Sequence, residues 1–258
     1  MDSASYKKKN GRYAMKYLNS ESFYKNNLLV ETVQHFKSFM KGKLLDLGCG
    51  NKPYSMIYKD VCESSVGCDV PFSLHTNSKV EVLCYAEDID KHFEKNSFDC
   101  VLCTEVLEHT VNDRKVVGNI NKILKQDGYL LVSVPFTYVL HEKPHDYRRY
   151  TVFGLQSILE TNGFEVLSVV SLGGTFSSGF FILYYSVTKI FFYTFKKAGL
   201  NLRSNKLIAA VINIPEYILY AFNISRFRKK LQAAEVPSAN EMFSSTGYFI
   251  AAKKLKDV

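Results

Sequence analysis

The sequence predicts an α/β fold built on a seven-stranded, mostly parallel sheet, and two observations predict it. From residue 43 onward, short apolar runs rich in β-branched residues alternate with segments of helix length, which is typical of a parallel sheet with helices on both faces. The apolar run 44–47 leads directly into Gly48-Cys49-Gly50, so a buried first strand ends in a sharp turn. A chain of 258 residues can bury a core of this size.

Each element follows from a local pattern. Apolar residues recur every three to four positions over 12–41 and predict helices ahead of the sheet. Lys125-Gln126-Asp127-Gly128 and Asn162-Gly163 indicate helix ends. The predicted helices between strands include 112–126 and 151–162, and the predicted strands lie near 43–47, 65–69, 80–84, 98–103, 129–134, 164–171 and 247–253.

The expected organisation is a single domain over 1–258, with N-terminal helices in 1–41. The core comprises 42–171 and 245–258, and a hydrophobic, basic helical insertion at 172–240 separates these two parts along the chain. Six cysteines fall mostly within predicted strands, and Cys100 and Cys103 would point to opposite faces of one strand. This placement favours core packing over a redox or metal role.

The glycine turn and the second strand describe a pocket for a nucleoside-bearing cofactor. Asp69 ends that strand about twenty residues later, where a carboxylate can accept hydrogen bonds from two ribose hydroxyls. A dinucleotide fingerprint needs a third glycine, but Pro53 occupies that position, with a ring and no N–H. S-adenosyl-L-methionine has no phosphate and tolerates this loop. An NAD(P)-dependent oxidoreductase and a membrane-associated scaffold with a vestigial cofactor site are the alternatives, and the intact Asp46 and Asp69 disfavour the scaffold.

Asp46-x-Gly48-x-Gly50 resembles the first motif of class I S-adenosylmethionine-dependent methyltransferases, which have a Rossmann-like fold. The run 97–109, with Leu107-Glu108-His109 after the predicted fourth strand, resembles the corresponding block of quinone-biosynthesis methyltransferases. The resemblance covers about 43–171 and the last strand, which in this fold is antiparallel. It implies a methyltransferase whose cofactor contacts are Asp46, Gly48, Cys49, Gly50, Asp69, Val70, Ala86, Glu87, Asp88, Cys103, Thr104, Glu105 and His109.

Three of these roles are specific. The resemblance implies that Asp46 supports the loop and the amino acid moiety of the cofactor, and that 103–105 lie beside the transferable methyl group. Ala86, Glu87 and Asp88 would meet the adenine, although either acid could instead be a helix cap. For His109, a structural hydrogen-bonding role stays open.

The segment 141–151 is the densest polar cluster in the chain. Its first five residues, His141-Glu142-Lys143-Pro144-His145, match the zinc-protease pattern, but that pattern requires a helix and Pro144 breaks one, so we expect no metal site. A loop leaving the fifth strand overhangs the methyl donor. The candidate catalytic residues are therefore His141, His145 and Asp146, and the candidate substrate-binding residues are Tyr147, Arg148, Arg149 and Tyr150.

Two interpretations of this loop stay open. Either histidine or Asp146 could take a proton from an acceptor hydroxyl, with the arginines holding a phosphate or carboxylate. Alternatively, internal salt bridges lock the loop. The stretch resembles a pattern in methyltransferases associated with surface-glycan and lipid-linked saccharide pathways, which implies a small or lipid-linked acceptor such as a glycan, a quinone-like compound or a lipid.

The net charge of +8 is concentrated in one place, because residues 196–230 carry +7. Basic residues beside the apolar segments 176–195 and 207–224 favour an anionic membrane surface, contacted through 176–230, over nucleic acid. Lys189 and the break at Pro215-Glu216 favour interfacial helices over membrane spans. A homodimer interface or a lid is the alternative. No secretory pattern appears at Met1, so we expect a cytoplasmic protein, peripheral at the inner face of the membrane.

Overall fold

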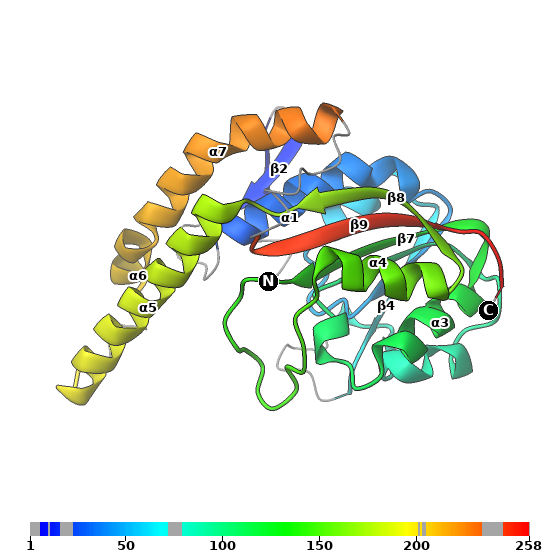
Figure 1. Ribbon diagram of the computed structural model, residues 1–258, viewed down its shortest axis with the longest axis horizontal. Helices are drawn as coiled ribbons and strands as arrows, with labels where there is room; N and C mark the ends of the chain where they lie inside the picture. The colour runs from blue at the N-terminus through cyan, green and yellow to red at the C-terminus, as the bar shows by residue number, and fades with distance from the viewer. Residues whose placement is uncertain are drawn as a thin grey trace.

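A seven-stranded sheet forms the centre of the computed structural model, which describes residues 6–9, 11–15, 23–71, 79–200, 202, 205–233 and 245–257. Its strands are β3 (Lys43–Leu47), β4 (Ser64–Asp69), β5 (Val82–Leu83), β6 (Phe98–Thr104), β7 (Leu124–Pro135), β8 (Phe164–Ser171) and β9 (Gly247–Lys254). Their order is β5-β4-β3-β6-β7-β9-β8 (Figure 1). The pairs from β5 to β7 are parallel, and β9 lies antiparallel between β7 and β8. The predicted fold class is confirmed.

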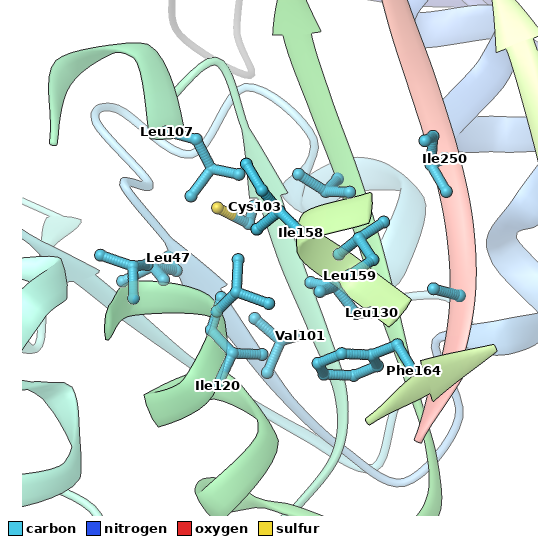
Figure 2. Close-up of a cluster of buried hydrophobic side chains, with 14 of the residues drawn as sticks. Leu47, Val101, Cys103, Leu107, Ile120, Leu130, Ile158, Leu159, Phe164 and Ile250 are labelled. Atoms are coloured by element: carbon cyan, nitrogen blue, oxygen red, sulfur yellow. The ribbon is translucent and has the colours of Figure 1, made fainter. Parts of the chain in front are cut away.

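Helices cover both faces of this sheet. α3 (Asp113–Ile123) and α4 (Val152–Thr161) pack on one face, where Leu47, Val101 and Cys103 contribute to the core (Figure 2). The opposite face, which includes Leu44 and Cys100, is covered by α1 (Phe23–His35). Because successive side chains of a strand point to opposite faces, strands buried on both sides read as continuous apolar runs. The two cysteines of β6 therefore lie in different cores, as the sequence predicted.

The N-terminal region differs from the predicted helices. β1 (Tyr6–Lys9) and β2 (Arg12–Met15) form an antiparallel hairpin in which Lys9 pairs with Arg12. The two residues between them are Asn10-Gly11, and Gly11 has a positive φ of 74°. Asn-Gly between two strands is a strong hairpin signal, and it outweighs the weak helical periodicity. Only α1 and the 3-10 turn η2 (Phe36–Phe39) are helical among the described residues of 12–41.

One predicted helix end is also wrong. α3 ends at Ile123 and β7 begins at the next residue, so 125–128 belong to the strand. Asp127 has a φ of 63°, and the register between β6 and β7 shifts between Phe98 and Cys100, as at a β-bulge. Turn residues thus mark an irregularity inside a strand. Asn162-Gly163 does follow the end of α4, and Gly163 has a φ of 80°.

Three helices connect β8 to β9. α5 (Thr175–Lys197), α6 (Lys206–Ile212) and α7 (Ile214–Ala233) form an arm, and α5 projects away from the sheet beside α6 (Figure 1). α7 returns along α1, where Glu216 accepts a hydrogen bond from the Tyr24 main-chain N–H (2.9 Å) and Arg228 pairs with Glu31. None of the described helices is long and apolar enough to span a membrane.

Candidate active site

The glycine turn after β3 meets the end of β4 at the carboxyl edge of the sheet. The main-chain N–H groups of Gly48 and Cys49 donate to the Cys68 carbonyl at 2.8 and 3.0 Å. Gly48 has a φ of 67°, and a Cβ there would lie 2.2 Å from Cγ2 of Val106. Only glycine fits this position without strain, and the turn therefore presents backbone rather than side chains.

Asp69 connects the turn to β4. Its Oδ2 accepts from the Gly50 N–H and its Oδ1 from the Val70 N–H, both at 2.7 Å. Each carboxylate oxygen has a second lone pair, so the group can still accept from a diol. Asp46 lies deeper and is 2% exposed, and the Tyr58 hydroxyl donates to it at 3.1 Å. Burial raises the pKa of Asp46 to about 7. A tight glycine turn beside a carboxylate with free lone pairs fits a nucleoside-bearing donor.

The predicted adenine contacts begin the 3-10 helix η4 (Ala86–Lys91). Ala86 is buried, Glu87 accepts from the Val111 N–H at 2.8 Å, and Asp88 pairs with Lys91 and Lys115. These two acids therefore organise neighbouring backbone and surface charge. Leu83 and Tyr85, at the end of β5, are exposed large apolar side chains. They offer a flat apolar surface that the sequence analysis did not identify.

The end of β6 carries the predicted methyl-site residues. Cys103 is fully buried, whereas Thr104 and Glu105 are partly exposed. Glu105 has a φ of 56°, accepts from the Ser133 hydroxyl at 2.9 Å, and pairs with Lys25. A non-glycine residue with positive φ is strained, and these contacts hold it in place.

Lys25 enters this site from α1. Its ammonium group lies 4.1 Å from the centre of the Tyr138 ring and is nearly buried. Burial alone would lower the pKa of Lys25, but the Glu105 carboxylate raises it, and the net shift is upward. The lysine is therefore a charged group at the site. Nothing in the local sequence marked it, because its partner is 80 residues away.

Glu108 and His109 lie in the 3-10 turn η5 (Leu107–His109). Glu108 is 0% exposed and neither carboxylate oxygen has a hydrogen-bond partner. Burial and then Glu105 raise its pKa well above the ordinary value. His109 Nδ1 lies 2.7 Å from the His145 carbonyl; since a carbonyl can only accept, Nδ1 carries a proton.

The loop after β7 brings His141 to this cluster. The His141 ring packs edge-on against His109, with centroids 4.7 Å apart. The Nδ1 atom of His141 lies 3.1 Å from Oδ2 of Asp146, at an angle that does not make a hydrogen bond. The main-chain N–H of His141 donates a hydrogen bond to the same oxygen at 2.9 Å. Arg149 pairs with Asp146 at 2.5 and 2.7 Å.

These contacts set the charge states of the loop. Burial opposes ionisation of Asp146, but Arg149 and the His141 N–H outweigh it and lower its pKa to about 2. Burial and the neighbouring His109 lower the pKa of His141. At neutral pH, Asp146 is therefore a fixed anion behind a neutral His141 ring.

Other predicted substrate residues serve the loop itself. Arg148 donates to the Thr110 carbonyl (2.8 Å), and the buried Tyr150 donates to the Leu107 carbonyl (3.1 Å). The His145 ring lies 3.1 Å from the Tyr147 hydroxyl, and Tyr147 is exposed. The Asp146–Arg149 ion pair lies within the loop, and the contacts of Arg148 and Tyr150 tie the loop to residues 107–110, while the Tyr147 side chain is exposed.

Within the part of the chain that the structure describes, one set of residues could hold a metal ion. Glu108, His109 and His141 each place a ligand atom within 4.8 Å of the others, and nitrogen and carboxylate ligands suit zinc-like ions. The set shares only His141 with the pattern His141-x-x-x-His145, whose residues are not helical.

Comparisons with known proteins agree with this geometry. A family model described as a methyltransferase domain matches residues 45–132. An uncharacterised protein of Methanocaldococcus jannaschii is 33% identical over 122 residues, which cover 46% of this chain and 51% of the relative. A ubiquinone biosynthesis O-methyltransferase of Rickettsia bellii is 24% identical over 150 residues, covering 48% and 62%. The chain thus spans between half and two thirds of these relatives.

Solved structures show the same fold at low identity. An S-adenosylmethionine-dependent methyltransferase from Archaeoglobus fulgidus superposes with a TM-score of 0.52 and 18% identity, covering 91% of this chain and 95% of that one. The cyclase SpnF superposes with a TM-score of 0.53 and 14% identity, covering 92% and 84%, so the fold alone does not specify the reaction. Residues 45–132 thus match a methyltransferase domain, and the glycine turn and the sheet order agree with the fold of S-adenosylmethionine-dependent methyltransferases.

Proposed function

We propose that this chain transfers a methyl group from S-adenosyl-L-methionine to a hydroxyl of a small or lipid-linked acceptor. The observation that carries the proposal is the position of His141 in the loop that follows β7. The Nδ1 atom of His141 lies 3.1 Å from Oδ2 of Asp146. Ligands of open α/β sheets bind outside the carboxyl ends of the strands. A neutral histidine at this edge is a suitable general base for a hydroxyl.

Methyl transfer to a hydroxyl requires that the acceptor oxygen be aligned with the methyl carbon and that one group accept the hydroxyl proton. When bound, the cofactor supplies an electrophilic methyl group on a sulfonium sulfur, and displacement needs positioning more than covalent catalysis. His141 would accept the hydroxyl proton as the oxygen attacks the methyl carbon and the carbon–sulfur bond breaks. The Asp146 anion favours the tautomer with its proton on Nδ1 and stabilises the cation that forms. Lys25 would hold Glu105 beside the methyl group.

The acceptor class rests on chemistry and on similarity. The Rickettsia bellii relative is named as an O-methyltransferase of ubiquinone biosynthesis, which supports an oxygen acceptor on a quinone-like ring. Tyr147 is exposed beside the loop and offers a stacking surface for such a ring. A glycan or a lipid with a free hydroxyl is chemically compatible with the same base.

We also propose that the helical arm contacts an anionic membrane surface. The most exposed apolar side chains include Phe222, Phe176 and Leu207, at 82%, 76% and 74%, and they lie on α7, α5 and α6. Lys196, Lys197 and Lys229 are exposed on the same helices. Apolar and basic side chains together bind interfaces that carry negative charge.

A label-transfer assay tests the reaction. The full chain is incubated with S-adenosylmethionine tritiated on the methyl group and a total lipid or glycan extract. Label is expected in the extract with the wild type and to be lost with Asp69→Ala, while His141→Ala lowers the rate. Tight NAD binding with no label transfer in any extract would contradict the proposal.

Vesicle flotation tests the membrane contact. The wild type is expected to float with phosphatidylcholine vesicles that contain phosphatidylglycerol, and the double variant Phe222→Ser/Leu207→Ser is expected to float less. Phe153→Ser is the matched control, because Phe153 is 67% exposed on α4, outside the arm. Full recovery in the unbound fraction, with a dimer by light scattering, would assign the arm to an interface between copies.

A further inference from the structure

A cavity lies between the edge strand β8, the start of α5 and the second half of α7. Its volume is about 260 Å³. None of the residues of the glycine turn, and neither Asp69 nor His141, lines it. It is therefore separate from the donor site, and neither the sequence analysis nor the proposed reaction uses it.

The walls of the cavity are largely apolar. They include Phe36, Val169, Phe176, Phe227 and Leu231, from both the sheet and the helices. Ligand sites are typically concave and apolar, with few polar groups. This cavity is smaller than the ~300–1,000 Å³ of sites for drug-sized molecules, so it suits a single hydrocarbon chain better than a fused ring system.

The charge at the cavity is positive. Arg226 and Lys230 both line it, and four residues apart on α7 they lie on the same helix face. Among the lining residues that the structure describes, none is Asp or Glu; the others with polar side chains are Tyr24, serines, a threonine and Asn223. Arg226 is exposed, so its guanidinium is accessible to an anion. Guanidinium and ammonium groups in such a pair suit a phosphate.

The base of α5 connects this cavity with the acceptor loop. Ser177 lines the cavity, and Phe181, one helical turn further, stacks on Tyr138 with centroids 5.3 Å apart. Tyr138 in turn packs against His141. A ligand in the cavity would therefore lie against the helix that supports this loop.

We propose that this cavity binds a lipid phosphate, with one hydrocarbon chain among the apolar side chains and the phosphate at Arg226 and Lys230. The apolar walls select for the chain, and the two basic residues of α7 select for the anionic head. The inference is independent of which acceptor is methylated, and it locates one lipid-specific contact within the arm.

Isothermal titration calorimetry on the full chain tests this site with octyl phosphate below its micelle concentration. The wild type is expected to bind, and Arg226→Glu/Lys230→Glu is expected to weaken binding about tenfold or more. Lys196→Glu/Lys197→Glu, which changes the same charge at exposed positions of α5, is expected to leave the affinity unchanged.

A second variant adds a side chain at the cavity without altering charge. Gly174 lines the cavity, and a Cβ built there meets no atom within 4 Å, so Gly174→Leu places a side chain in open space. This variant is expected to lose octyl phosphate binding and to keep S-adenosylmethionine binding, which separates this site from the donor site.

Four results would overturn the proposal. The first is the absence of octyl phosphate binding by the wild type. The second is equal affinity for inorganic phosphate, which would show an anion contact alone. The third is equal affinity for octyl glucoside, which would show an apolar contact alone. The fourth is wild-type affinity in the Arg226→Glu/Lys230→Glu variant.

Discussion

Replacing Asp69 by alanine tests the donor site directly, because one carboxylate joins the glycine turn to β4. Its two oxygens each accept a main-chain N–H at 2.7 Å, from Gly50 and from Val70. The remaining lone pairs would accept the ribose hydroxyls of the cofactor. The substitution therefore removes contacts within the protein and contacts to the ligand at the same time.

The size of each effect follows from these bonds. A hydrogen bond to a charged group contributes about 1.5–3 kcal/mol. We expect Asp69→Ala to lower the free energy of unfolding by about 2–4 kcal/mol, since the Gly50 N–H is left without a partner in a buried turn. Loss of two ribose contacts of similar strength would weaken S-adenosylmethionine binding by about 10²–10⁴-fold.

Calorimetric titration with S-adenosylmethionine and urea denaturation measure the two quantities. Asp99→Ala is the matched control, because Asp99 lies at the start of β6, accepts from the Lys43 N–H at 2.8 Å, and pairs with Lys125. That variant should lose stability and keep its affinity. If Asp69→Ala also keeps its affinity while losing stability, Asp69 is a structural acid and the donor-site assignment is wrong.

Four further predictions follow from specific contacts. Gly48→Ala should lose about 1–2 kcal/mol of unfolding free energy because its φ is positive, and about 1–3 kcal/mol more because its Cβ overlaps Val106. The control Gly199→Ala, at a φ of 83° with open space around it, should lose only the contribution from φ. Equal losses of stability for the two variants in urea denaturation would refute the overlap. Lys25→Met should cost about 3–5 kcal/mol by breaking a nearly buried ion pair, whereas Lys8→Met, in the exposed pair with Asp60, should change the urea midpoint little. Because burial raises the pKa of Asp46 from 3.8 to about 7, this group stabilises the fold below about pH 4 and loses that contribution as the pH rises through about 7; the decline should be absent from unfolding curves of Asp46→Asn. His141→Ala should lower the rate constant kcat by about 10²–10⁴-fold. The wild-type rate should rise with pH around a midpoint below 6.5, the ordinary pKa of the group, and this rise should be absent from the variant. An unchanged pH profile would exclude His141 as the base.

The sheet could be predicted closely because its signals are local. Strands buried on both faces appear as apolar runs, and β3 and β8 begin and end at the predicted residues. The errors arose where two local signals compete. Asn10-Gly11 indicated a turn within a region of weak helical periodicity, and 125–128 contain turn residues that form an irregularity inside a strand.

The candidate site was predictable only in part. The glycine turn and Asp69 follow strands in sequence, and strand ends meet at one edge of a parallel sheet. Lys25 could not be found in this way, because it reaches Glu105 from a helix that packs against the sheet. The same holds for the pairing of His141 with Asp146 and Arg149, since a loop sequence does not specify which of its charged groups contact each other.

The sequence by itself determined where the strands lie along the chain, the turn that accommodates a methyl donor and the insertion before the last strand, because buried runs, glycines and charge clusters are properties of neighbouring residues. Only the tertiary structure decided which groups share the site: a fully buried Glu108 with a raised pKa, a His141 beside the Asp146 anion, and Lys25 paired with Glu105. Charge states depend on burial and on partners distant in the chain, and both exist only once the helices have packed on the sheet.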